Sequence, residues 1–97
     1  MNLINYKYKD LLSMSKADFD KALAEDNSNV GFLASLENLM KLSYGQLQAV
    51  LVGLDKDGCK EEEKKKLYEQ TAALMMSIEY KICCIVEKKN RLITSEE

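Results

Sequence analysis

The sequence contains neither histidine nor proline. Without histidine, the chain lacks the commonest general base and the commonest transition-metal ligand, so Ser-His-Asp and Cys-His catalytic arrangements cannot form. Without proline, no side chain forces a helix to end. The few glycines build no GxGxxG or GxxxxGK loop of the kind that holds phosphates. We therefore expect a protein that is not an enzyme, with no catalytic residue and no cofactor.

Arginine is nearly absent as well. Arg91 is the single arginine, and the formal net charge is −2. A nucleic-acid-binding protein normally gains most of its affinity from a basic face, and arginine is best suited to bidentate contacts with phosphates and bases. The basic clusters at 64–66 and 88–91 are accompanied by acids and contain no aromatic residue, which favours a solvated charged surface. We therefore expect no nucleic-acid partner.

Long apolar runs are also missing. The most apolar stretch, residues 71–86, is interrupted by Glu79 and Lys81, so it falls short of the roughly 18 apolar residues that a membrane span needs. The first ten residues, MNLINYKYKD, lack the apolar core of a signal peptide. Three cysteines without a CxxC motif fit a reducing compartment better than a disulfide framework. These features predict a cytoplasmic protein with no membrane partner.

Three patterns in the sequence resemble metal sites in part. The turn at 55–58 (DKDG) resembles part of a calcium loop. If Gly58 is the glycine at the sixth loop position, the first ligand falls on Gly53 and the twelfth on Lys64, and neither side chain can bind calcium. Cys59, Cys83 and Cys84 have no zinc-binding spacing, and the acids at 61–63 point around a helix instead of converging. We expect no metal. Cys83 is expected to pack as a small apolar residue and Cys84 to be a partly exposed thiol.

Capping chemistry marks the first predicted helix, over residues 15–25. Ser15 and Asp18 form an approximate capping box, and Met14 and Phe19 are placed for a hydrophobic staple. The expected apolar face consists of Phe19, Ala22 and Leu23. Residues 1–14 are predicted to form an N-terminal arm, in which tyrosines alternate with lysines as in a short strand or an irregular segment.

A second helix is predicted over residues 29–54, with Ser28 or Asn29 as its cap. Ser43 with Gln46 is another capping box, and Gly45 is unfavourable in a helix interior. These signals favour a kink or a brief break at 42–45, which would divide the helix in two. A single continuous helix that tolerates the glycine is the alternative. Apolar residues recur at steps of three and four, as in a packed seam: Leu33, Leu36, Met40, Leu47, Val50 and Leu54.

The third predicted helix, over residues 60–91, is the longest element. Its acids at 61–63 precede its lysines, an order that suits the helix dipole. Its apolar arc, from Leu67 to Val86, is wider than the stripe of a little over 100° that one neighbour requires. The helix would extend about 45 Å, whereas a compact chain of this size has a radius of gyration of only about 13 Å. We therefore predict an all-α single domain, in which residues 29–54 and 60–91 form a long antiparallel, bundle-like hairpin completed by dimerisation.

The outer arc of this third helix is the candidate interaction or dimer surface. Methionine supplies adaptable apolar area there. Tyr80 projects opposite the main seam, where it either meets a partner or is covered by the helix over 15–25. The candidate residues are Leu74, Met75, Met76, Ile78, Tyr80, Ile82, Cys83 and Cys84.

Together these features favour a small non-enzymatic interaction protein, such as an adaptor, inhibitor, chaperone or regulator, that binds a protein partner and forms a homodimer. In size, lysine bias and helical build it resembles small phage or plasmid accessory proteins and bacteriocin immunity proteins, without a motif in common. One rival is a nucleic-acid-binding transcriptional regulator in which the first helix and the halves of the second form a helix-turn-helix. It would need a basic recognition helix, but residues 44–54 carry no charge. Another rival is a small-ligand binder with a pocket at the dimer seam.

Overall fold

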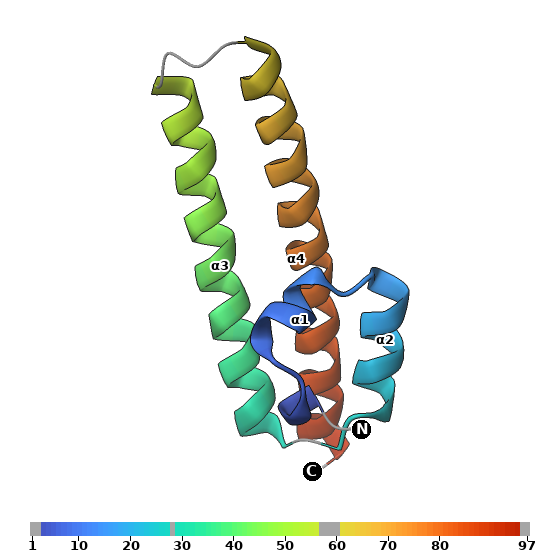
Figure 1. The fold of residues 1–97 in the computed structure, drawn as a ribbon. Coiled ribbons are helices and arrows are strands. Elements are labelled where there is room, and N and C mark those ends of the chain that lie inside the picture. The colour runs from blue at the N-terminus through green and yellow to red at the C-terminus, as the bar shows by residue number, and fades with distance from the viewer. Residues whose placement is uncertain (1–2, 28, 57–60, 96–97) are drawn as a thin grey trace.

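The computed structural model describes residues 3–27, 29–56 and 61–95. These residues are almost entirely helical, and none of them forms a strand, so the predicted all-α class is confirmed. The elements in chain order are the 3-10 helix η1 (Leu3–Asn5) and the α-helices α1 (Tyr8–Ser13), α2 (Lys16–Glu25), α3 (Val30–Lys56) and α4 (Glu61–Ser95) (Figure 1).

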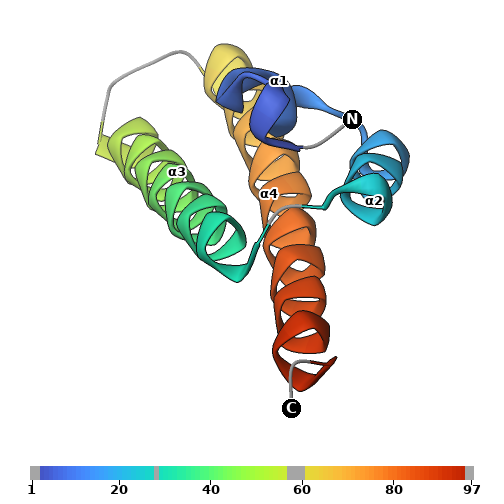
Figure 2. The ribbon, with the colours of Figure 1, turned by 90° about the horizontal axis from the view of Figure 1, so that it is seen from below.

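The two long helices pack along each other, and the short N-terminal helices cover only one half of the pair. Figures 1 and 2 both show α4 lying between α3 and α2, while α1 sits against the same half of the molecule. The molecule measures 54 × 22 × 17 Å, and its radius of gyration of 15.8 Å exceeds the value of about 13 Å for a compact chain of this length. The fold is therefore elongated.

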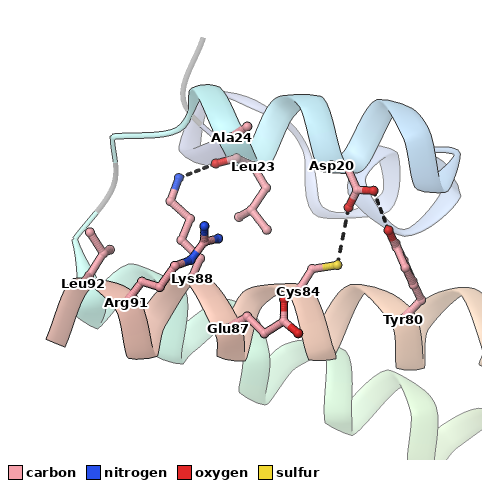
Figure 3. A pocket seen from close by; sticks show the side chains of 9 residues that line it. All are labelled: Asp20, Leu23, Ala24, Tyr80, Cys84, Glu87, Lys88, Arg91 and Leu92. Carbon is pink, nitrogen blue, oxygen red and sulfur yellow. Dashed lines mark hydrogen bonds between the residues drawn. The ribbon is translucent and has the colours of Figure 1, made fainter. Parts of the chain in front are cut away.

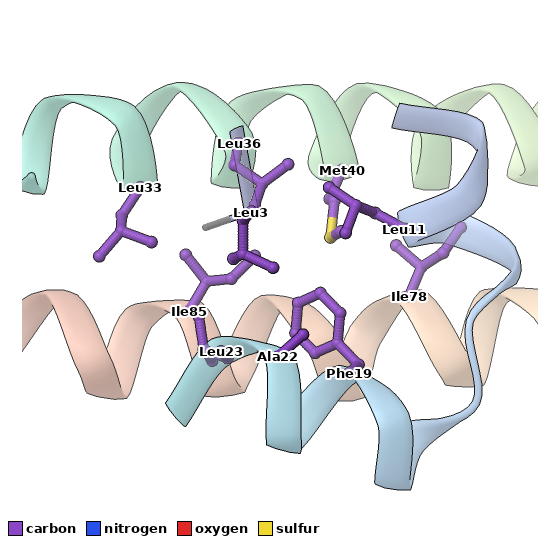
Figure 4. Close-up of a cluster of buried hydrophobic side chains, with 10 residues drawn as sticks. All are labelled: Leu3, Leu11, Phe19, Ala22, Leu23, Leu33, Leu36, Met40, Ile78 and Ile85. Atoms are coloured by element: carbon purple, nitrogen blue, oxygen red, sulfur yellow. The ribbon is translucent and has the colours of Figure 1, made fainter. Parts of the chain in front are cut away.

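The hydrophobic core lies in the half that α1 and α2 cover, which we call the base. Leu33, Leu36 and Met40 of α3 point toward α4 there (Figure 4). We call the rest of the long helices the extension: residues 48–56 of α3 and 61–77 of α4. Among its described residues, only Leu54 and Met75 are buried apolar side chains. The core residues of the base are Leu3, Leu11, Phe19, Ala22, Leu23, Leu33, Leu36, Met40, Ile78 and Ile85.

Helix α2 begins as its capping signal predicted. The backbone N–H of Asp18 donates to Ser15 Oγ at 3.1 Å, and the helix runs over Lys16–Glu25. The predicted apolar face is confirmed, since Phe19, Ala22 and Leu23 are all buried. A local signal within one helical turn was therefore sufficient to place this element.

The predicted break in the second helix is wrong, and the continuous alternative is what the structure shows. Helix α3 runs without interruption through Ser43 and Gly45. Ser43 Oγ forms a hydrogen bond of 2.7 Å with the hydroxyl of Tyr8, so it serves a contact with α1 instead of a cap. At the start of α3, the N–H of Phe32 donates to Asn29 Oδ1 at 2.8 Å, which makes Asn29 the cap. Ser28 and residues 57–58 of the predicted DKDG turn lie outside the described residues.

The N-terminal arm also differs from expectation, because its described part is helical and not a strand or an irregular segment. Leu3 of η1 and Leu11 of α1 are both buried in the core of the base. The N–H of Leu3 donates to the buried carboxylate of Asp26 at 2.7 Å, which fixes η1 to the end of α2. Burial of Leu3 and Leu11 thus organises the arm, although its tyrosine–lysine alternation suggests an exposed strand.

Candidate functional site

A buried lysine joins α4 to the end of α1. Lys81 is fully buried, and its Nζ donates to the backbone carbonyls of Leu11 at 2.9 Å and Leu12 at 2.7 Å. Its ammonium also lies 5.6 Å from the centroid of the Phe19 ring, within the range of a cation–π contact. Burial lowers the pKa of Lys81. The last carbonyls of a helix lack intrahelical donors, so this lysine supplies a cap for α1 from another element.

Lys88, two turns further along α4, caps the C-terminal end of α2 in the same way. Its Nζ donates to the carbonyl of Leu23 and, at 2.6 Å, to the carbonyl of Asp26, and it lies 3.9 Å from the Asp26 carboxylate. The basic cluster around Lys88 was predicted to be a solvated surface, and for Lys88 that prediction is wrong. A lysine in a charge run is indistinguishable by composition from one that caps a distant helix.

Lys89 connects α4 to α3. Its Nζ donates to the largely buried carboxylate of Glu37 at 2.7 Å, and Lys41 forms an ion pair with the other oxygen of that carboxylate, also at 2.7 Å. Hydrogen bonds from Lys41 and then Lys89 hold the pKa of Glu37 below its usual value. Lys81, Lys88 and Lys89 therefore fasten α1, α2 and α3, respectively, to α4.

A cavity of about 650 Å³ lies between α2 and α4 (Figure 3). Within it, the Asp20 carboxylate accepts hydrogen bonds from the hydroxyl of Tyr80 and, at 3.4 Å, from the thiol of Cys84. The bond to Asp20 raises the pKa of Tyr80, and burial is the main cause of the raised pKa of Cys84. A thiol with a raised pKa is a poor nucleophile at neutral pH. These three polar groups are directed at one another, and Glu87, Lys88 and Arg91 also line the cavity.

The structure divides the eight predicted surface residues into three groups. Met75 and Ile78 are buried, and Ile82 packs against the core of the base. Tyr80 and Cys84 face α2, so the alternative in which the helix over 15–25 covers Tyr80 is the one observed. Lys16 of α2 lies over the Tyr80 ring at 5.2 Å. The exposed group consists of Leu74, Met76 and Cys83. Cys83 was expected to pack and does not, whereas Cys84 is half-buried as expected.

The exposed apolar surface extends beyond these residues onto α3. Val50, which was predicted to lie in a packed seam, is 49 % exposed, and Leu42 and Val52 are also exposed. On α4, Leu67 and Tyr68 are exposed in the same half of the molecule. One signal could have indicated this surface: residues 42–54 contain no charged side chain, although such a segment would normally need a charged face toward water.

Helical register shows which side of the long pair these residues occupy. Val50 follows Ser43 by two turns, and Leu74 and Leu67 precede Lys81 by two and four turns. Ser43 and Lys81 both form hydrogen bonds to α1. Residues seven apart lie on nearly the same face of a helix, so Val50, Leu67 and Leu74 lie on the α1 side of the pair, past the end of α1. We call these three residues the α1-side strip; Val52 and Met76 face away from it.

Within residues 3–27, 29–56 and 61–95, no helix is long and apolar enough to cross a membrane, and no three His, Cys, Asp or Glu side chains are grouped to hold a metal ion. No family model matches the chain, and no match was found among curated proteins or solved structures.

Proposed function

We propose that this protein is a small interaction module without enzymatic activity, acting in the cytoplasm as an adaptor, inhibitor, chaperone or regulator, and that it binds a protein partner through the apolar surface of its extension. One observation carries the proposal. Residues 42–54 of α3 carry no charge, and Val50 among them is exposed on the same side of the long pair as the exposed Leu67 and Leu74 of α4. Exposed apolar area of this kind, concentrated in one part of a small protein, marks binding surfaces.

Magnitudes favour a partner that covers the surface along its length. Covering one half-exposed valine or leucine contributes on the order of 1 kcal/mol. Association itself costs about 4–15 kcal/mol before any affinity appears. Several side chains must therefore be covered together, which a helix lying along the extension can do and a small ligand cannot.

In this proposal the long helices act as an antiparallel hairpin that is one half of a bundle. A two-helix layer buries apolar side chains only along the seam between its helices, and the remaining faces need a further layer. The base receives that layer from α1 and α2, which lie against one half of the pair only. The partner supplies it for the extension.

The two rival functions have less support. The helix-turn-helix hypothesis required a break between two halves of the second helix, but α3 is a single helix over Val30–Lys56. The part of α3 that would have served as a recognition helix also carries no cation to neutralise phosphate. The small-ligand hypothesis placed its pocket at a dimer seam and stays a prediction; the cavity between α2 and α4 lies within one chain, and in it Asp20 accepts hydrogen bonds from Tyr80 and Cys84.

Site-specific photo-cross-linking in the cell of origin tests this proposal. We expect a Val50→benzoylphenylalanine variant to give one or a few discrete protein adducts, because position 50 lies on the proposed surface. The same substitution at Lys21, an exposed residue of α2 in the base, is the control and should give none. Absence of any adduct at position 50, or the same adducts at both positions, would show that the extension is not the binding surface.

A further inference from the structure

We infer that the occupant of the extension is a second copy of this chain, with the α1-side strips of two extensions facing each other in a four-helix bundle. This inference rests on the proposed function and names its partner. It also relocates the dimer contact predicted from sequence. That prediction placed the contact on the outer arc of α4. Much of this arc makes contacts within the chain, since Ile78 is in the core and Tyr80 bonds to α2.

The position of the strip shows what kind of element is missing. In the base, α1 lies over this side of the long pair and contacts both helices, through the Tyr8–Ser43 hydrogen bond on α3 and through Lys81 on α4. Past the end of α1, the same side continues as Val50, Leu67 and Leu74, and no other described segment covers it. The vacant position is that of a helix, or pair of helices, running along the extension.

Charge favours a second copy as the occupant. Because residues 42–54 are uncharged, two copies can bring their α3 segments together without desolvating a charge or opposing like charges. An acidic or basic partner would find no opposite charge on this part of α3. The run at 61–66, at the start of α4, has three glutamates and three lysines. Its net charge is zero, so the run does not repel a second copy.

Dimensions favour the same conclusion. The 17 residues of α4 in the extension (61–77) correspond to about 25 Å of helix at ~1.5 Å per residue. A second extension has the same length, so it is long enough to cover the strip when the two are aligned along a two-fold axis. Self-complementary pairing of this kind is the usual geometry of homodimers. The end of α1 borders the strip in each copy and limits how far the second copy can slide.

The chain supplies a matched pair of variants for the test. Val50 is 49 % exposed and Val52 is 55 % exposed, and they lie two residues apart on α3, facing different sides. We expect the average mass of the unmodified protein in sedimentation equilibrium to rise with concentration from the monomer mass of 11.1 kDa toward twice that value. Val50→Glu should raise the Kd at least about tenfold, since it places charges in the apolar contact. Val52→Glu should leave the Kd within about threefold of the original value.

Circular dichroism of both variants should show unchanged helix content, because both positions are exposed in the single chain. A monomer at all concentrations would overturn the inference, as would equal effects of the two substitutions or a larger effect of Val52→Glu. These outcomes are separable from failure of the proposed function. A monomeric protein whose position 50 cross-links to a different protein refutes the second copy but retains the interaction surface, whereas an absence of all adducts at position 50 refutes both.

Discussion

Lys81 is the residue on which the attachment of α1 depends most directly. A buried ammonium is costly to desolvate, and it is tolerated where hydrogen bonds and favourable dipoles compensate. Lys81 has two carbonyl acceptors in the last turn of α1, where the helix dipole is negative, and the face of Phe19 nearby. Its role therefore differs from that of a surface lysine, although nothing in the local sequence distinguishes the two.

We predict that Lys81→Met lowers the free energy of unfolding by about 1–3 kcal/mol, because the carbonyls of Leu11 and Leu12 lose their donor while the aliphatic packing is kept. Urea denaturation measures the change. Lys21→Met on the exposed face of α2 is the control and should stay within about 0.5 kcal/mol.

The same variant tests the lowered pKa of Lys81. Between this lowered pKa and the ordinary lysine value of about 10.4, the unfolded chain binds more protons than the folded one, so stability rises with pH. Tyr8 and Tyr80, whose pKa values are raised, act in the opposite direction but are present in both proteins. The stability difference between the original protein and Lys81→Met should therefore widen as the pH rises toward the ordinary lysine pKa. A difference that does not change with pH would contradict the assignment.

At this scale, sequence reasoning succeeded where the partner is nearby in the chain. The Ser15 cap spans three residues and was predicted. Lys81 meets Leu11 across 70 residues, and Tyr80 meets Asp20 across 60. Charged residues are usually exposed, so only the fold could show that one lysine is buried. The choice between a covered and a free Tyr80 was left open for the same reason.

At the scale of elements, α3 shows a local signal overridden by tertiary structure. The Ser43–Gln46 pair and Gly45 indicate a helix break on capping statistics. The helix continues because its apolar side chains pack on α4 and because the Ser43 hydroxyl forms a hydrogen bond with Tyr8. The N-terminal arm shows the reverse case. Its sequence carries weak helix signals, and burial of Leu3 and Leu11 organises it.

Gly45 provides a direct test of this account of α3. A Cβ added there would meet nothing within 4 Å, and the backbone is helical. We therefore expect Gly45→Ala to stabilise the protein by about 0.5–1 kcal/mol, which corresponds to a rise in Tm of roughly 3–6 °C. Gly31→Ala is the matched control, because its Cβ would lie 3.3 Å from Asn29 Oδ1, the oxygen that caps α3. It should give no such gain, and a loss of stability in Gly45→Ala would indicate that α3 is not continuous at this point.

For the whole molecule, helix length was the most informative feature of the sequence. A helix of the predicted length must overhang a compact base, and the 54 Å long axis agrees with this expectation. The width of the apolar arc on α4 was less informative, because an arc does not identify the element that covers it. Met75, Ile78 and Ile85 are buried within the chain, whereas Val50 and Leu67 are exposed. Which half of the long helix pair α1 and α2 would cover was not encoded in any local pattern.

The division into base and extension predicts an uneven distribution of stability along each long helix. Amides near Leu36 and Ile85 lie beside the core and should exchange with solvent only in global unfolding, whereas those near Val50 and Leu67 have few buried apolar contacts and should open locally. In dilute solution we expect amide hydrogen exchange to be at least about tenfold faster in the extension than in the base. If a second copy covers the α1-side strip, raising the protein concentration should slow exchange near Val50 and Leu74 while leaving Leu36 and Ile85 unchanged, because binding stabilises only what it covers. Uniform protection along α3 would instead mean that the extension is as stable as the base within a single chain, and its exposed apolar side chains would then need no partner.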